Sequence, residues 1–430
     1  MKKKNLFISA ALFSAALLVA CGGGNNTTTG GNNTPTTPAT QTYNIKVWCA
    51  ENLVSLTTTQ LNDFKTLYPT LNVEFTVDPV GEGDAASNMM TDVEAGADVF
   101  CFPQDQLARL VSAGALAPIT GTVAEQVIER NDESSVAAGT LDETLYAFPL
   151  TADNGYFMYY DKAVISEDHI DSMEEIIADC IDNNKLFSMQ LSTDGGWYNA
   201  GFFFSQGCVS EWQSDSKGIF TGFTDTYNSE AGVKAMRAMN NLINSGVWNN
   251  ASSVGAFNTG SAVVVSGIWD YEAAVTAFTD ANNPERINDL GICELPSYTL
   301  DGTSYHIGSF SGNKLVGIKP QIDATKAAIC QLIGDYLTSE KAQQERFDAV
   351  SWGPSNKVVQ ASQEVQANPA LAALTAQAEY AIPQGQYPIE WWDYAAAIGS
   401  SLDELTLDAS DAELKAILET YATAISGLIA

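Results

Sequence analysis

The stretch Asp98-Val-Phe-Cys-Phe-Pro-Gln-Asp-Gln-Leu-Ala-Arg-Leu-Val-Ser-Ala-Gly114 decides the fold. Its first five residues, Asp98–Phe102, form a short apolar run that predicts a strand. Apolar side chains then recur at helical spacing, which predicts a helix over Gln106–Ser112, and Gly114 supplies a C-terminal stop. A strand that leads through a short polar turn into a helix is the repeating unit of a parallel sheet wound with helices.

The residues before this stretch repeat the same alternation. Asn44–Trp48 and Val73–Val77 predict two more strands. A helix capped by Thr57–Thr59 and ended by Pro69 separates them, and another helix is predicted over Ser87–Glu94. In such sheets, ligands bind beyond the carboxyl ends of the strands. The residues at those ends are Cys49–Asn52, Asp78–Gly83 and Phe102–Asp105.

The segment before the first strand has the features of an export signal. Three lysines at positions 2–4 precede the apolar run Leu6–Ala20, and Cys21 follows at once. A basic region, a short apolar region and a small residue before the cut predict a secretory signal peptide over residues 1–20. The apolar run is too short to span a bilayer comfortably as a permanent helix.

The Leu-Val-Ala-Cys ending of this segment resembles the lipobox of bacterial lipoproteins. The resemblance implies cleavage before Cys21 and attachment of lipid to its sulfur, whereas an ordinary signal peptide with a chance cysteine is the alternative. Residues 21–42 carry no charge and no large apolar side chain, so a flexible tether is expected there. These features together predict a lipid-anchored protein on the extracellular face of the bacterial cytoplasmic membrane.

Length and charge limit what the rest of the chain does. Residues 43–430 are too many for one ordinary core, so two domains are expected. The sequence has 20 Lys+Arg against 52 Asp+Glu and a formal net charge of −32. Nucleic acids and anionic membrane surfaces need cationic stripes, which this sequence lacks. Neutral polyols or cations remain as partners, although acidity that only maintains solubility explains most of these residues equally well.

Cysteine and histidine usage indicates no zinc or iron site, and no cofactor is predicted; calcium stays open because acidic loops are plentiful. His169 and His306 lie far apart, no Cys-x-x-Cys pair occurs, and no Asp-rich loop has the calcium-binding pattern. An extracellular compartment permits disulfides, but free buried thiols fit a chain of this size equally well. The pairing state is therefore left open for Cys49, Cys101, Cys180, Cys208, Cys293 and Cys330.

Five stretches, taken together and in order, resemble the family 1 extracellular solute-binding proteins of ABC importers, the family of the maltose/maltodextrin-binding proteins. The stretches are 96–119, Leu145–Asp161, Ala256–Trp269, Lys326–Glu345 and Ile389–Ile398. The resemblance covers nearly all of residues 43–430. Each stretch alone is a weak signal, but five in the right order with similar spacing are specific.

This resemblance implies a periplasmic-binding-protein-like α/β fold. It has two lobes, each a doubly wound and mainly parallel sheet with helices, and a ligand cleft between them. Chain order then assigns 43–152 plus 309–357 to lobe one and 153–308 plus 358–430 to lobe two. The lobes close around the ligand by a hinge motion, and the closed form, expected to be a monomer, passes its ligand unaltered to membrane permease subunits.

The residues expected to hold the ligand follow from the resemblance and from sugar chemistry. Carboxylates accept strong hydrogen bonds from paired hydroxyls, and aromatic rings stack on the apolar face of a sugar. By position, the resemblance points to the acids Asp78, Asp105 and Asp153 and to Glu51 and Asn52 after the first strand. It also points to the aromatic residues Phe102, Trp197, Tyr198, Trp269, Trp352 and either Trp391 or Trp392.

Some of these residues have a purely structural alternative. Asp105 precedes a predicted helix and fits a helix cap, and Trp269 fits a core position. The sequence Gly81–Ala86 formally matches a Gly-x-Gly-x-x-Ala dinucleotide motif, but Glu82 and Asp84 within it would repel a pyrophosphate. No Gly-x-Ser-x-Gly elbow and no P-loop occur.

The sequence therefore predicts a binding protein for an oligosaccharide, with a maltodextrin-like glucan as the first candidate. A receptor for a polyamine or another cationic solute is the alternative within the same class, because the chain is rich in acids. Two alternatives come from other classes. A glycoside hydrolase needs only two suitably spaced carboxylates, and a surface adhesin would also be anchored by lipid.

Overall fold

The computed structural model describes residues 41–193 and 195–429. Residues from Thr42 onward form one compact unit. The predicted signal peptide, Cys21 and nearly all of the predicted tether lie outside the described residues. Within the described ranges, no helix is both long enough and apolar enough to cross a membrane.

The first sheet has five strands in the order β2-β1-β3-β17-β6. They are β1 (Tyr43–Cys49), β2 (Val73–Pro79), β3 (Val99–Pro103), β6 (Ala147–Thr151) and β17 (Lys314–Ile318). Strand β1 pairs in parallel with β2 and β3, whereas β17 runs antiparallel to both β3 and β6. The sheet is therefore mainly parallel, as predicted, with β17 inserted from a distant part of the chain.

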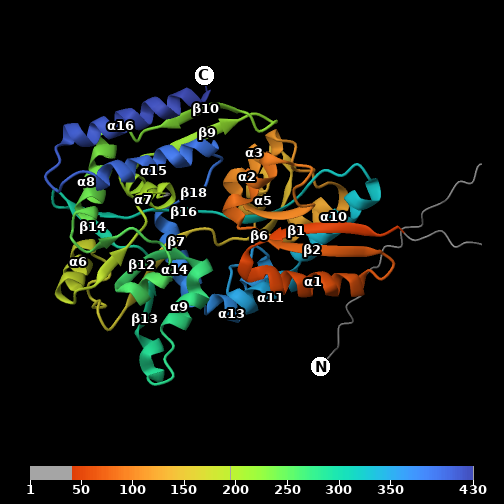
Figure 1. Ribbon diagram of the computed structural model, residues 1–430, viewed down its shortest axis with the longest axis horizontal. Coiled ribbons are helices and arrows are strands. Elements are labelled where there is room, and N and C mark those ends of the chain that lie inside the picture. The colour runs from red at the N-terminus through yellow and green to blue at the C-terminus, as the bar shows by residue number, and fades with distance from the viewer. Residues whose placement is uncertain (1–40, 194, 430) are drawn as a thin grey trace, which may run out of the picture. The chain divides into compact units, whose positions relative to one another are not determined.

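Helices cover both faces of the first sheet, so its inner strands are buried on both sides. They are α1 (Val54–Leu67), α2 (Glu82–Thr91), α3 (Leu107–Ser112) and α10 (Ala324–Leu337). On one face, α1 and α10 pack together and bury Phe64 and Ile333. On the other, Met89 of α2 and Leu110 of α3 join Phe100 of β3 in a separate cluster. Figure 1 shows α10 beside the first strands although it lies far along the chain.

Two predicted helix starts differ from the structure. Helix α1 begins at Val54, directly after the short helix η1 (Glu51–Leu53), and not at a threonine cap. The hydroxyl groups of Thr58 and Thr59 instead donate to carbonyl oxygens four residues earlier in the helix, at 2.7 and 3.0 Å. Helix α2 begins at Glu82 rather than Ser87. For α2 the prediction followed apolar spacing and so missed its polar first turn, Glu82–Asp84.

The second sheet also has five strands, in the order β11-β8-β12-β7-β13. They are β7 (Tyr156–Asp161), β8 (Leu186–Ser188), β11 (Trp248–Asn249), β12 (Ser261–Gly267) and β13 (Leu290–Cys293). Strand β7 is antiparallel to β12 and β13, whereas β8 is parallel to β11 and β12. Each sheet thus contains a single reversed strand, which confirms the predicted two-sheet α/β architecture.

The second sheet carries helices from two parts of the chain. They are α6 (Met173–Asp182), α7 (Gly196–Ser205), α8 (Glu230–Ile243), α9 (Tyr271–Ala277), α14 (Pro369–Gln377), α15 (Ile389–Asp403) and α16 (Asp411–Ser426). Helices α7, α8, α15 and α16 pack against one another, whereas α14 lies on β7 and β13. In Figure 1 the dark-blue α15 and α16 lie against α7 and α8.

Shorter elements complete the described chain. The remaining helices are α4 (Gly121–Arg130), α5 (Glu133–Ala138), α11 (Glu340–Val350), α12 (Lys357–Gln360) and α13 (Gln363–Gln366). Four two-stranded pairs are β4 (Thr140–Leu141) with β5 (Thr144–Leu145), β9 (Ser210–Ser214) with β10 (Phe220–Asp225), β14 (Ser297–Leu300) with β15 (Thr303–His306), and β16 (Ser309–Ser311) with β18 (Ala381–Pro383).

The six cysteines of the described chain form no disulfide. Cys293 is half-buried and the other five are buried. Burial raises the pKa of the Cys101 thiol well above its ordinary value, so the group stays protonated and packs as a small apolar side chain. Within the same described residues, no group of three or more His, Cys, Asp or Glu side chains is placed to hold a metal ion.

The chain runs between the two sheets in three segments, called the crossing segments below: 152–155, 307–313 and 351–356. They lie side by side. The Ala152 amide donates to the Gly353 carbonyl at 3.0 Å, and the Asn154 amide donates to the Gly312 carbonyl at 2.9 Å. The predicted lobe boundaries fall in or next to these segments and stay a prediction.

Candidate ligand-binding site

A cavity of about 580 Å³, called the cleft below, lies beyond the carboxyl ends of β2 and β3. This is where a mainly parallel sheet presents ligand-binding residues. The first sheet and its helices contribute the buried or half-buried charged side chains Glu82, Asp105, Arg109 and Lys314 and the exposed Asp84, and α15 contributes the exposed Asp393. The other wall contributes Trp197 of α7, Trp269 of the short helix η4 (Ile268–Asp270) and Trp392 of α15, and Trp352 comes from a crossing segment. The volume falls in the range of ordinary small-ligand sites.

Helices α2, α7 and α15 all begin at the cleft, because residues of their first turns line it. The unpaired N–H groups of a helix's first turn are ready hydrogen-bond donors. Gly196 is what lets α7 and α15 meet here. A Cβ atom at this glycine would lie 2.9 Å from the Trp392 carbonyl oxygen and 3.1 Å from the Ala395 Cβ. The local sequence therefore brings two helix starts to one wall.

The aromatic rings of the cleft form two groups. Trp197 stacks on Phe310 with ring centroids 4.7 Å apart, and its centroid lies 5.9 Å from that of Trp392. Trp269 and Trp352 flank the Lys314 ammonium group, which lies 5.5 and 4.2 Å from their ring centroids. These rings provide flat apolar surfaces for a ligand with a C–H face.

The Trp269 ring depends on the neighbouring Gly267. A Cβ atom at Gly267 would lie 2.2 Å from a carbon of this ring. The ring therefore lies directly over the glycine backbone, where no other residue leaves room for it. The Gly-Ile-Trp order at the end of β12 thus sets the orientation of this tryptophan.

Asp105 and Arg109 form a buried ion pair in the cleft, with 3.4 Å between the Asp105 Oδ2 and Arg109 Nη2 atoms. Their exposed fractions are 3% and 8%. Burial raises the pKa of Asp105 to about 6, although the Arg109 guanidinium and the Trp392 indole counter part of that rise. Burial also lowers the pKa of Arg109. The charge of Asp105 therefore changes just below neutral pH.

The structure does not support the helix-cap interpretation of Asp105. The residue lies in the short helix η2 (Gln104–Gln106), and α3 begins after Gln106 without any side-chain cap. Its carboxylate faces Arg109 on the next turn of the chain instead.

Lys314 occupies the floor of the cleft, close to two carboxylates. Its ammonium group donates to Asp153 Oδ1 at 3.1 Å, and the other Asp153 oxygen accepts from the Gly353 amide at 2.6 Å. Burial raises the pKa of Glu82, and the nearby Lys314 charge partly offsets this rise. Lys314 therefore forms an ion pair with Asp153 and also lowers the pKa of Glu82 through its charge.

Several buried polar atoms of the cleft have no hydrogen-bond partner among the described residues. They are Glu82 Oε1, Asp105 Oδ1, Arg109 Nε, Arg109 Nη1 and Trp352 Nε1. An unpaired buried donor or acceptor costs about 1–3 kcal/mol, and more when it is charged. Both donors and acceptors are thus available to a ligand that carries several hydroxyl groups.

The structure brings five of the predicted site residues together at the cleft. They are Asp105, Trp197, Trp269, Trp352 and Trp392. Asp153 does not line the cleft itself but forms an ion pair with Lys314, which does. These five residues come from separate stretches of the sequence and line one cavity. That they contact a ligand stays a prediction.

The structure places the other predicted residues elsewhere. Trp391 is fully buried, and its indole N–H donates to Ser210 Oγ and Tyr421 OH at 2.9 Å. Of the two adjacent tryptophans, Trp392 therefore faces the cleft. Phe102 is fully buried beside Phe100 in the core of the first sheet.

Four further predicted residues do not line the cleft either. Tyr198 is buried against Tyr156, with 4.9 Å between ring centroids. Glu51 and Asn52 are exposed in η1, and Asp78 is half-buried near the end of β2. The prediction selected the right strand ends, but these side chains point away from the cavity.

Sequence reasoning missed five charged residues that line the cleft: Glu82, Asp84, Arg109, Lys314 and Asp393. Glu82 lies within the strand-end segment 78–83 that was singled out, but the acid chosen there was Asp78. Arg109 follows Asp105 by four residues, a spacing that places two side chains together on helical backbone. Lys314 offered no local signal, because only the pairing of β17 with β3 and β6 brings it to the floor.

The paired sheets and the enclosed cleft define a two-lobed binding protein. Residues 60–373 match the family model described as bacterial extracellular solute-binding protein. The match spans more than half of the chain, so this protein belongs to that family. Members of this family bind solutes, so the chain is a binding protein and not an enzyme.

Solved structures share the fold. A protein solved with acarbose is 24% identical, over 90% of this chain and 98% of its own, with a TM-score of 0.76. The maltodextrin-binding protein MalE1 from L. casei BL23 is 18% identical over 90% and 99%, with a TM-score of 0.73. The GacH receptor of Streptomyces glaucescens GLA.O is 19% identical over 89% and 99%, with a TM-score of 0.70. A search of curated proteins finds no match.

Proposed function

We propose that the cleft binds a maltodextrin-like oligosaccharide and that the protein passes it unaltered to the permease of an ABC importer. One observation carries the proposal. Four tryptophan rings and four buried or half-buried charged side chains converge on a single cavity, and several of the polar atoms are unpaired. A glucan offers the matching surfaces, because its rings have C–H faces for stacking and hydroxyl edges for hydrogen bonds.

The charge arrangement favours a neutral sugar over a polyamine. Asp105 already faces the Arg109 guanidinium, and Glu82 lies near the Lys314 ammonium group. A cationic ligand would have to displace or repel both cations of the cleft. A neutral sugar uses the same four groups as donors and acceptors. The solved relatives with acarbose and maltodextrin in their names support the sugar as well.

We further propose that the protein is held at the extracellular face of the membrane by lipid on Cys21. The Leu-Val-Ala-Cys sequence supports this, and membership of an extracellular solute-binding family agrees with it. Mass spectrometry of the mature N-terminus tests the anchor. A diacylglyceryl group on Cys21 is expected, whereas an unmodified Cys21 would contradict it.

Hinge closure of the two predicted lobes completes the proposal. The lobes would rotate about the three crossing segments, with 43–152 plus 309–357 on one side and 153–308 plus 358–430 on the other. Small-angle scattering with and without ligand measures this closure. An unchanged radius of gyration on saturation with sugar would contradict it.

A thermal-shift screen tests the ligand class. The purified protein is heated alone and with mono- to hexasaccharides of glucose, with other glycans, and with spermidine. A ligand that binds only the folded state raises the melting temperature by mass action. We expect a rise with maltodextrins that is smaller in Trp269→Ala. A rise with spermidine only, or with no compound, would contradict the proposal.

A further inference from the structure

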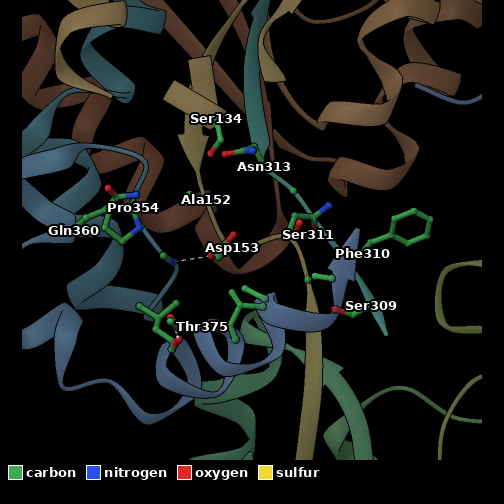
Figure 2. Close-up of a pocket in the computed structure, with 18 of the residues that line it drawn as sticks. Ser134, Ala152, Asp153, Ser309, Phe310, Ser311, Asn313, Pro354, Gln360 and Thr375 are labelled. Atoms are coloured by element: carbon green, nitrogen blue, oxygen red, sulfur yellow. Dashed lines mark hydrogen bonds between the residues drawn. The ribbon is translucent and has the colours of Figure 1, made fainter. Parts of the chain in front are cut away.

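A second cavity, of about 680 Å³, adjoins all three crossing segments. It is distinct from the cleft and shares only Asn154 with it. Figure 2 shows Ser134 and Asn313 on one wall, Thr375 of α14 on the opposite wall, and Ser309 to the side. Because the segments that join the two sheets line it, this cavity is a structural feature of the crossing and not a surface groove of one sheet.

The lining of the second cavity is polar but carries almost no free charge. Its polar side chains are mostly amides and hydroxyls, including Ser134, Asn313, Gln360 and Thr375. Asp153 is the only charged side chain among the described residues that line it, and both of its oxygens already accept hydrogen bonds, from Lys314 and from the Gly353 amide. A charged ligand would therefore find no counter-charge, whereas a neutral polar ligand finds donors and acceptors.

An apolar strip faces these polar groups. It is formed by Val365, Leu371 and Leu374, from helices α13 and α14. Aliphatic side chains beside amides and hydroxyls suit a molecule with C–H groups on one face and hydroxyls on its edges. A small carbohydrate or a cyclic polyol has this surface.

One side chain of the second cavity has an unused hydrogen-bonding group. Ser309 is fully buried, and its Oγ atom has no partner among the described residues. A buried hydroxyl without a partner is unfavourable and calls for an explanation. Asn313, by contrast, already bonds Gln104 at 2.9 Å through its amide nitrogen. Ser309 is thus the group that a ligand would engage without breaking an existing bond.

A wall of amide side chains separates the second cavity from the cleft. The Asn154 side-chain amide donates to Gln384 Oε1 at 3.1 Å, and the Asn313 backbone amide donates to Gln104 Oε1 at 2.8 Å. Gln104 also donates to the Gln384 carbonyl oxygen. Molecules in the two cavities would therefore be separate ligands, bound at the same time.

We propose that the second cavity is a binding site for a small neutral polyhydroxylated molecule of mono- or disaccharide size. The molecule bound there is separate from the ligand in the cleft. The cavity's recognition elements are the Ser309 hydroxyl, the amide and hydroxyl wall, and the apolar strip on α13 and α14. The proposal does not rest on the proposed function, because it uses residues that the cleft does not.

The experiment measures binding of glucose and maltose by saturation-transfer NMR and calorimetry, with glucose 6-phosphate as a charged control. Three single variants are compared with the natural protein. Ser309→Ala removes only the unpaired hydroxyl, and Ala372→Trp places a ring in the cavity from an exposed position on α14. Trp269→Ala alters the cleft alone.

We expect binding of glucose or maltose to persist in Trp269→Ala, to weaken by about tenfold in Ser309→Ala, and to disappear from this site in Ala372→Trp. Glucose 6-phosphate is expected not to bind there. The proposal is overturned if Ser309→Ala and Ala372→Trp bind like the natural protein, if Trp269→Ala abolishes all binding, or if the phosphate ester binds equally well. If the second cavity gives the expected results but the cleft binds no maltodextrin, only the proposed function is refuted.

Discussion

The adjacent residues Trp391 and Trp392 offer a matched pair of substitutions on one helix. Trp391 is fully buried, and its N–H group donates to both Ser210 and Tyr421 at 2.9 Å. Trp392 lines the cleft, and its ring lies 5.9 Å from Trp197. The same change to alanine therefore removes core packing at one position and ligand surface at the next.

The expected magnitudes differ accordingly. Trp391→Ala should lower the free energy of unfolding by about 3–5 kcal/mol, which is typical for a large buried aromatic, and it also leaves two hydrogen-bonding groups without their partner. Trp392→Ala should reduce the free energy of sugar binding by about 1–3 kcal/mol through lost stacking area. That loss corresponds to a Kd raised by about 5- to 150-fold.

Denaturant unfolding and calorimetric titration with maltodextrins measure both quantities for each variant. Trp391→Ala should unfold at lower denaturant concentration, and its folded fraction should bind sugar with nearly natural affinity. Trp392→Ala should unfold at nearly the natural denaturant concentration but bind sugar more weakly. The reasoning is refuted if Trp391→Ala weakens binding by the folded fraction as much as Trp392→Ala does, or if Trp392→Ala leaves the affinity unchanged.

Two further predictions concern single groups of the cleft. Because burial raises the pKa of Asp105 to about 6, affinity for a sugar that bonds its carboxylate should fall as pH drops through 6, by up to about tenfold per unit. The folded state holds this proton more tightly than the unfolded state, so Asp105 should make the protein more stable as pH falls from about 6 to about 4. Titrations and melting curves over this range check both trends, and Asp105→Asn should reduce both; a pH-dependence that is unchanged in Asp105→Asn would contradict the assignment. Gly267→Val should displace the Trp269 ring, which the glycine accommodates, and weaken binding about as much as Trp269→Ala; natural affinity in Gly267→Val would show that the ring position does not matter.

The sequence predicted the first half of the fold well because its signals are local. Strands β1, β2 and β3 follow from short apolar runs, and the helices between them follow from apolar spacing. The position of β17 could not be predicted in this way. It enters the first sheet from residue 314 and pairs with β3 and β6, so its place depends on contacts between distant parts of the chain.

The candidate site shows the same limit. Strand ends and aromatic residues were visible in the sequence, so Asp105, Trp269 and Trp392 were named. Lys314 was not, because a lysine at the start of a strand has no local mark of function. Neighbours on a helix differ by about 100° in direction, but which of Trp391 and Trp392 faces the cleft depends on how α15 packs on α7 and α16.

Calorimetric titration of the purified protein with maltose through maltohexaose tests the central claim most directly. The cleft is expected to bind one oligosaccharide, with an affinity that hardly changes between low and high salt because the ligand is neutral. The sugar should be recovered intact after release. No binding of any glucan, or binding of spermidine that weakens steeply with salt, would contradict the assignment of the cleft as a sugar site.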